Sequence, residues 1–155
     1  MKINIKHFDE LTTKELYEIL YLRCKVFVVE QACIYQDCDG KDKDAYHLMM
    51  YDDDLVGYLR ILKPGVSYDE ISIGRVLVKE EYRHLKLGKE IMKEAISFIE
   101  AEGYNKIRIS AQLYLEKFYQ SLGFESASES YLEDDIPHIE MAYKKSWLFI
   151  KIELV

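Results

Sequence analysis

The sequence predicts one domain of the mixed α/β class, with a central mixed sheet flanked by helices. Apolar residues recur with a period of two in some segments and with a helical period in others. The order strand, helix, strand between residues 71 and 112 predicts a parallel crossover. A chain of 155 residues, 49% of them hydrophobic, can fill one core and is too short for two ordinary domains.

The N-terminal half is expected to form a strand, a helix and then three strands. Residues 1–6 alternate like an edge strand. The helix is expected to start at a cap formed by Thr12 or Thr13 and to end before Ala32. An acidic turn at residues 52–54 is typical of a hairpin. The three strands are expected at residues 45–51, 55–62 and 71–78.

Two residues interrupt the apolar strand at 71–78. Gly74 is expected to mark a bulge that opens the sheet, as glycine within a strand often does. Arg75 follows it, and an unpaired guanidinium inside an apolar strand is costly. We therefore expect Arg75 to pair with a carboxylate or to face a cleft, and pairing is favoured.

The C-terminal half is expected to complete the order β-α-β-β-β-α-β-α-β-β. A helix at about 87–102 carries one apolar stripe and ends at Gly103. It is followed by a strand at 106–112, a helix at 115–122 and strands near 124–131 and 138–143. The domain is expected to span residues 1–145. The apolar extension at 146–155 should pair with the sheet or, slightly favoured, with a second copy of the chain in a homodimer.

The formal net charge of −7 argues against a nucleic-acid-binding surface, which needs clustered lysine and arginine. Neither a signal-like start nor a stretch of about 18 apolar residues is present, so we expect a soluble cytoplasmic protein without a membrane partner. Most acidic runs are expected to be solvated loops, with an acidic rim that attracts a cationic amine as the alternative. These runs lie at residues 37–44, 52–54 and 133–135.

No metal is expected. Cys24, Cys33 and Cys38 are an odd number without a secretory signal, which favours free thiols. A zinc site made by Cys33, Cys38 and His47 matches no closed four-ligand pattern. A calcium loop centred on Gly40 would lack both of its end carboxylates.

The segment from residue 83 to 89 joins the strand at 71–78 to an amphipathic helix. The first turn of a helix has unpaired N–H groups and a positive dipole end, so it can bind an anion through the main chain. Gly88 is expected to take up a positive φ and let the backbone approach phosphates, while Arg83 and Lys86 or Lys89 supply charge. The segment therefore predicts a pyrophosphate-binding loop.

A second segment runs from Gln112 through Tyr119 to Gly123-Phe124 and is predicted as strand, helix and turn. Together the two segments resemble the acyl-CoA-binding motifs of the GNAT superfamily of N-acetyltransferases. Lys86 stands where that family usually has a glycine, and Gln112 where it has an asparagine. The resemblance covers residues 2–143 and implies the GNAT fold, with acetyl-CoA as acyl donor. Three further segments resemble the ElaA-like branch, at residues 23–31, 39–47 and 133–138.

The resemblance also implies roles. Backbone groups of Val76, Leu77 and Val78 are expected to hold the pantetheine arm and to polarise the thioester. Tyr119 is the expected general acid, because a phenol can protonate the departing thiolate. The general base is left open among Glu30, His47 and His138, with a water relay as the alternative. The expected cofactor-binding residues are Val76, Leu77, Val78, Arg83, His84, Leu85, Lys86, Leu87, Gly88, Lys89 and Gln112.

The expected function is transfer of an acetyl group from acetyl-CoA to a primary amine by direct attack in a ternary complex. The amine acceptor is expected to be a small molecule or an exposed amine of a protein. The alternative is a non-catalytic acyl-CoA-binding or interaction domain. A third interpretation is an anion-binding protein unrelated to CoA.

Overall fold

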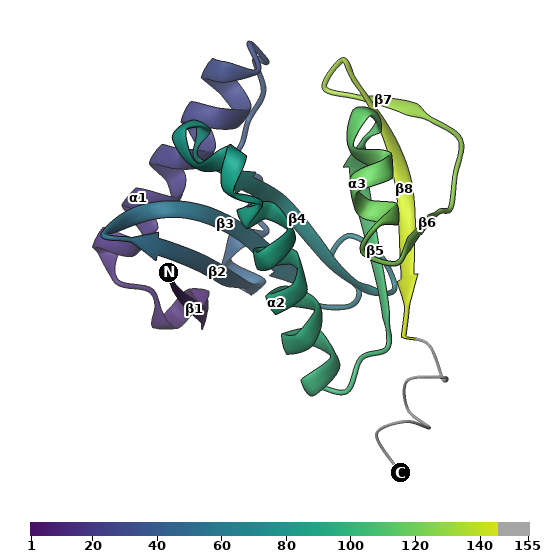
Figure 1. Ribbon diagram of the computed structural model, residues 1–155, viewed down its shortest axis with the longest axis horizontal. Helices are drawn as coiled ribbons and strands as arrows, with labels where there is room; N and C mark the ends of the chain where they lie inside the picture. Colours follow the sequence, from purple (N-terminus) through teal and green to yellow (C-terminus); the bar gives the residue numbers. More distant parts are fainter. Residues whose placement is uncertain (146–155) are drawn as a thin grey trace.

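The computed structural model describes residues 1–145; the apolar extension at 146–155, and the pairing expected for it, lie outside the described residues. The predicted mixed α/β fold is confirmed (Figure 1). One sheet has the strand order β1-β2-β3-β4-β5-β8-β6, and β7 also pairs with β8. The strands are β1 (Lys2–His7), β2 (Ala45–Asp52), β3 (Asp54–Leu62), β4 (Ile71–Val78), β5 (Lys106–Gln112), β6 (Phe124–Ser126), β7 (Tyr131–Glu133) and β8 (Ile136–Lys144).

The first helix starts where the sequence predicts. The hydroxyl of Thr12 accepts a hydrogen bond from the N–H of Glu15, and the Glu15 carboxylate accepts one from the N–H of Thr12. The α-helix continues directly into a π-helix, which keeps the chain helical to Glu30. The α-helices are α1 (Thr13–Arg23), α2 (Leu87–Ala101) and α3 (Glu116–Gln120); the shorter elements are η1 (Phe8–Glu10), the π-helix η2 (Cys24–Glu30), η3 (Asp42–Asp44), η4 (Glu80–Leu85) and η5 (Leu113–Leu115).

Helices cover both faces of the sheet, because side chains along a strand alternate between its two faces. Met49 of β2 packs in a cluster with Ile19 of α1 and Val26 of η2. The next residue, Met50, belongs to the larger cluster that contains the apolar stripe of α2 and Tyr119 of α3. Thus α1 and η2 cover one face, while α2 and α3 cover the other.

The strands follow the predicted connections. β1 to β4 are antiparallel neighbours in chain order, and the β2–β3 hairpin turns at Asp53, whose φ is 60°. The predicted crossover through α2 is confirmed, because β4 and β5 run parallel. Their register covers only two residue pairs, Ile71 with Ile107 and Ser72 with Arg108. Beyond these pairs the strands diverge toward their C-terminal ends (Figure 1).

The predicted bulge in β4 is confirmed. Tyr58 of β3 pairs with Leu77, but Arg60 pairs with Gly74, so β4 holds one residue more than β3 over this stretch. The residue that takes up the left-handed conformation is Arg75, with φ 53°, and not the glycine before it. The bulge lies just beyond Ser72, the last residue of β4 that pairs with β5.

Two predicted elements near the C-terminus were wrong in extent. The strand expected at 124–131 is two short strands, because the polar segment 127–130 between them is exposed and crosses to the other end of β8. The helix expected at 115–122 is a 3-10 turn, η5, followed by the five-residue α3. Both segments are short, so the sequence period within them is a weak signal.

Candidate active site

The diverging ends of β4 and β5 bring together several of the predicted site residues (Figure 1). Val76, Leu77 and Val78 lie on β4 beyond its last pair with β5. Gln112 ends β5, and Tyr119 follows in α3. The backbone edge of β4 that faces β5 therefore has no strand partner there within residues 1–145, which leaves peptide groups for a ligand.

The loop after β4 presents the predicted helix N-terminus, but with a different backbone conformation. Lys86 takes the left-handed conformation, with φ 58° and ψ 28°, directly before α2. The expectation that Gly88 has a positive φ was wrong, because Gly88 already lies in the first turn of α2. Lys86 makes no side-chain cap, so the first N–H groups of α2 have no cap from it and remain suited to an anion.

Gly88 contributes open space rather than an unusual conformation. A Cβ atom at this position would lie 3.7 Å from Cζ of Phe118 in α3 and 3.9 Å from Cγ2 of Val78 in β4. Both are ordinary van der Waals distances. A side chain here would therefore point between the end of β4 and α3 without disturbing either, and would occupy the approach to the α2 N-terminus. His84, Leu85 and Lys89 are exposed on the same loop and first turn.

Arg83 and Glu30, predicted for different roles, form an ion pair with each other. Nη2 of Arg83 lies 2.6 Å from Oε2 of Glu30, and Nε of Arg83 donates to the carbonyl oxygen of Val78 at 3.0 Å. Both charged side chains keep about a third or more of their surface exposed, at 42% and 32%. Such a pair contributes little stability. Glu30 therefore lies beside the loop that precedes α2 and is paired with Arg83.

Gln112 connects β5 to the N-terminal part of the chain. Its side-chain amide exchanges two hydrogen bonds of 3.2 Å with the amide of Gln31, the residue that follows η2. Sγ of Cys33 adds a contact of 3.4 Å to the carbonyl oxygen of Asp134 in the β7–β8 turn. The segment after η2 is thus held against β5 and the β7–β8 hairpin at the open end of the sheet. Sequence reasoning did not find Gln31, because nothing in its local pattern marks its partner.

Tyr119 is buried in an aromatic cluster. Its ring makes edge contacts with Phe118 and Phe124, with centroids 5.1 and 6.0 Å away. No hydrogen bond joins its hydroxyl to another residue within 1–145, and the residue as a whole is 6% exposed. Burial raises the pKa of Tyr119 above its usual value, so the phenol holds its proton throughout the neutral range.

His47 lies in the core of the sheet and not at its open end. It is fully buried on β2, with Nε2 2.9 Å from the carbonyl oxygen of Asp42 and Nδ1 2.7 Å from the hydroxyl of Tyr58. Because a carbonyl oxygen only accepts, Nε2 carries the hydrogen and Nδ1 accepts from Tyr58. Burial lowers the pKa of His47, which favours the neutral ring. Both nitrogens are occupied, so this position argues against a role as general base.

His138 lies at the open end. It is the cross-strand partner of Gln112 on β8, and its ring stacks on Tyr131 with centroids 6.2 Å apart. Nδ1 lies 2.7 Å from the carbonyl oxygen of Ile136, so Nδ1 carries a hydrogen. Nε2 lies 3.2 Å from Oε2 of Glu133, which is half exposed. The two ring nitrogens therefore lie beside a carbonyl oxygen and a carboxylate.

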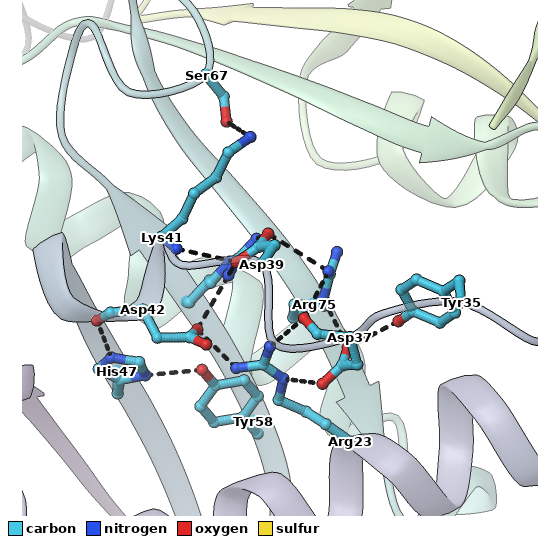
Figure 2. Close-up of polar contacts among 11 residues, drawn as sticks. Arg23, Tyr35, Asp37, Asp39, Lys41, Asp42, His47, Tyr58, Ser67 and Arg75 are labelled. Atoms are coloured by element: carbon cyan, nitrogen blue, oxygen red, sulfur yellow. Dashed lines mark hydrogen bonds and ion pairs between the residues drawn. The ribbon is translucent and has the colours of Figure 1, made fainter. Parts of the chain in front are cut away.

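A closed cycle of three arginines and three aspartates lies on the α1 side of the sheet (Figure 2). We call it the Arg–Asp ring. Each aspartate bridges two arginines, and each arginine comes from a different element: α1, β3 or β4. The predicted pairing of Arg75 is confirmed, whereas the expectation of a solvated acidic loop was wrong for Asp37 and Asp42, which are buried. In order, its members are Arg23, Asp37, Arg75, Asp39, Arg60 and Asp42, which closes on Arg23.

The ring is largely buried and its charges are balanced. The Arg23 side chain is inaccessible to solvent, and it contacts Asp37 at 2.9 Å and Asp42 at 2.7 Å. Burial alone would raise the pKa of Asp39 and Asp42. Hydrogen bonds and charge from the arginines outweigh burial and lower both pKa values, that of Asp39 well below its usual range. Residue spacing does not reveal this cycle, because its members span residues 23–75.

We expect acid to destabilise the protein through the ring. A carboxyl with a depressed folded-state pKa contributes stability above its unfolded pKa, about 3.9 for aspartate, and this stability is lost as pH falls below that value. Urea unfolding should therefore show a midpoint that declines between about pH 5 and pH 3. The Asp39→Asn variant should decline less steeply. Equal slopes for parent and variant would show that Asp39 does not contribute.

Two further properties bear on the predicted partners. Within residues 1–145, no group of three or more His, Cys, Asp or Glu side chains is placed to hold a metal ion. No helix in this part of the chain is long and apolar enough to span a membrane.

Comparison with known proteins identifies the family. A family model described as an acetyltransferase (GNAT) domain matches residues 11–145. Protein ElaA of Escherichia coli (strain K12) is 44% identical over 140 residues, which cover 88% of this chain and 92% of that protein. Two crystal structures, an acyl-CoA N-acyltransferase from Pseudomonas aeruginosa and Escherichia coli ElaA, superpose with TM-scores of 0.86 and 0.85. Each is 41% identical to this chain, and each match covers 92% of this chain and 99% of the other one. The chain therefore belongs to the GNAT family of acetyltransferases, in its ElaA-like branch.

Proposed function

We propose that the protein transfers an acetyl group from acetyl-CoA to a primary amine, which attacks the thioester directly in a ternary complex. The observation that carries this proposal is the position of the α2 N-terminus, which the short η4 joins to the part of β4 that has diverged from β5. One ligand could therefore place a diphosphate at the α2 N-terminus and extend an arm along the free edge of β4. The three free cysteines fit a reducing compartment, so we propose a cytoplasmic location.

The residues at this end of the sheet have the chemistry that acetyl-CoA requires. The first N–H groups of α2, together with Arg83 and Lys89, offer donors and positive charge to the phosphates. The free edge of β4 at Val76 and Val78 offers peptide groups to the amides of the pantetheine arm. When bound, acetyl-CoA supplies the activated acyl group. Peptide N–H groups of β4 near the thioester would stabilise the negative charge that develops on its oxygen.

In the proposed reaction the amine nitrogen forms a bond to the carbonyl carbon, and the carbon–sulfur bond breaks with its electron pair remaining on sulfur. Tyr119 gives its proton to that sulfur, because it lies in the helix after β5 and its hydroxyl has no competing hydrogen bond within residues 1–145. The attacking amine loses one proton and the departing thiol gains one. The transfer is therefore balanced without any other reactant.

We propose His138 as the group that accepts the proton of the amine. Its Nδ1 hydrogen is held by the carbonyl oxygen of Ile136, so Nε2 is the position that takes up the proton. Glu133, 3.2 Å from Nε2, stabilises the imidazolium that forms. Of the other two candidates, Glu30 is paired with Arg83, and His47 is sealed in the core.

The experiment that tests this function is an acceptor screen with detection of free thiol. The full chain is mixed with acetyl-CoA and a panel of small primary amines and lysine-containing peptides. Thiol release above the rate without acceptor, together with acetylated amine by mass spectrometry, supports the proposal. Binding of acetyl-CoA by calorimetry without turnover on any amine would instead indicate an acyl-CoA-binding domain. Absence of CoA binding would reject both functions.

Release of Arg83 should strengthen CoA binding. In the Glu30→Gln variant the guanidinium loses its anionic partner and becomes available to a phosphate. We expect the CoA affinity to rise by roughly 2- to 5-fold, the scale of an exposed ion pair. The CoA affinity of the parent should also fall as the salt concentration rises from 50 to 500 mM, because salt screens the attraction between these cationic side chains and the phosphates. Calorimetry measures both, and unchanged affinity in Glu30→Gln would contradict the competition between Glu30 and phosphate.

A further inference from the structure

The Arg–Asp ring includes the residue that forms the bulge in β4. Arg75 has a φ of 53°, a conformation that side-chain-bearing residues seldom adopt. Its neighbour Gly74 would tolerate a positive φ more easily, yet the strain falls on the arginine. Something outside the local backbone must therefore favour this conformation at Arg75.

The side chain of Arg75 is anchored at several points (Figure 2). Nε donates to Oδ1 of Asp37 at 2.9 Å, and Nη2 donates to the carbonyl oxygen of Asp37 at 3.1 Å. Nη2 also reaches Oδ2 of Asp39 at 3.5 Å. The guanidinium lies over the ring of Tyr35, 5.5 Å from its centroid. These contacts fix where the side chain points, and hence the backbone from which it departs.

The rest of the ring makes this anchor rigid. Asp37 is also bonded to Arg23 of α1, which is fully buried, and to the hydroxyl of Tyr35 at 2.7 Å. Asp39 is also bonded to Arg60 of β3, the residue whose register with Gly74 defines the bulge. The ring therefore ties the bulge both to the neighbouring strand and to the helix that covers this face. A shift of Arg75 would break its contacts to Asp37 and Asp39, each of which is also held by an arginine of another element.

We propose that the Arg–Asp ring holds the β4 bulge in place and thereby positions the backbone of Val76 to Val78 for the thioester. This inference rests on the proposed function. Arg75 is then a positioning residue: it acts through the backbone that follows it and does not touch the reacting atoms. The bulge lies in the part of β4 that no longer pairs with β5, and the ring keeps the backbone there the same in every molecule.

The test separates the two halves of the ligand. Arg75→Gln should weaken acetyl-CoA binding by roughly 10-fold and lower kcat by roughly 10- to 100-fold, the scale of a small misplacement of reacting groups. Binding of the nucleotide half alone, 3′-phosphoadenosine 5′-diphosphate, should change by less than about 2-fold, because it depends on the α2 N-terminus. Arg108→Gln is the matched control. Arg108 lies on β5 with comparable exposure and also bridges two carboxylates, Glu70 and Glu140, but is not part of the bulge.

The outcomes are distinct. Loss of acetyl-CoA binding with retained nucleotide binding in Arg75→Gln, but not in Arg108→Gln, supports the proposal. Parent-like binding and kcat in a folded Arg75→Gln protein, or equal loss for both ligands, overturns it.

If Arg75→Gln does not fold, Arg75→Lys replaces it, since a lysine keeps the charge but cannot contact both aspartates through a planar fork. If both variants unfold, the ring serves only global stability. A parent that binds neither ligand rejects the proposed function, and this inference with it.

Discussion

Replacing Tyr119 by phenylalanine should lower kcat by roughly 100-fold or more, the usual scale for a lost general acid. The change removes one hydroxyl and keeps the ring, whose edge contacts with Phe118 and Phe124 hold it in place. That hydroxyl makes no hydrogen bond within residues 1–145, so no partner is left unsatisfied and the free energy of unfolding should not fall. Steady-state kinetics with an amine that the parent acetylates well, and thermal unfolding, measure the two effects.

A matched control for this variant is Tyr114→Phe. Tyr114 lies five positions earlier in the same segment, and its side chain is exposed. Loss of its hydroxyl should leave kcat and CoA affinity unchanged. If Tyr119→Phe turns over at the parent rate, Tyr119 is only a packed aromatic residue and the proton reaches the thiolate by another route.

A valine at position 88 should abolish measurable CoA binding, a loss of at least about 100-fold or roughly 2.7 kcal/mol. The reason differs from the one suggested by the sequence, because Gly88 is helical and needs no positive φ. Its missing side chain leaves the space between Val78 and Phe118 open beside the α2 N-terminus. A branched side chain in that space would keep phosphates away from the N–H groups. Calorimetry with acetyl-CoA measures the loss.

Gly88→Ala gives the graded control. Its Cβ would meet atoms only at 3.7 and 3.9 Å, so the variant should fold like the parent, and alanine favours the helix. CoA affinity should fall by a smaller factor, on the order of 10-fold. The urea midpoints of both variants establish that the fold is intact. Parent-like affinity in a folded Gly88→Val protein would place the phosphates elsewhere.

The sequence predicted the parts of the site that depend on local pattern. The run at 71–78, the helix starting near Leu87 and the strand at 106–112 were located almost to the residue, because each has a strong periodic signal. The predicted phosphate-binding loop lies between such a strand and the N-terminus of the next helix, so predicting these two boundaries also located the loop. The bulge followed from a glycine inside an apolar run. The short elements between residues 113 and 133 were less well predicted, since few residues define each period.

Only the tertiary structure decided which candidate groups meet. Glu30 and Arg83 are 53 positions apart in the sequence and form one ion pair, while His47 and His138 are chemically alike in the sequence but lie in different parts of the sheet, with different partners. The acidic residues at 37–42, which have the composition of a solvated loop, are instead the partners of arginines from three elements. The physical reason is that the periodic patterns of strands and helices depend on residues that are close in the sequence. The charge pairs and the left-handed conformation of Arg75 depend instead on groups that come together only when the sheet and its covering helix have assembled. The sequence by itself determined the fold and the position of the loop that we propose binds the cofactor; the assembled structure determined how the candidate site is held in shape.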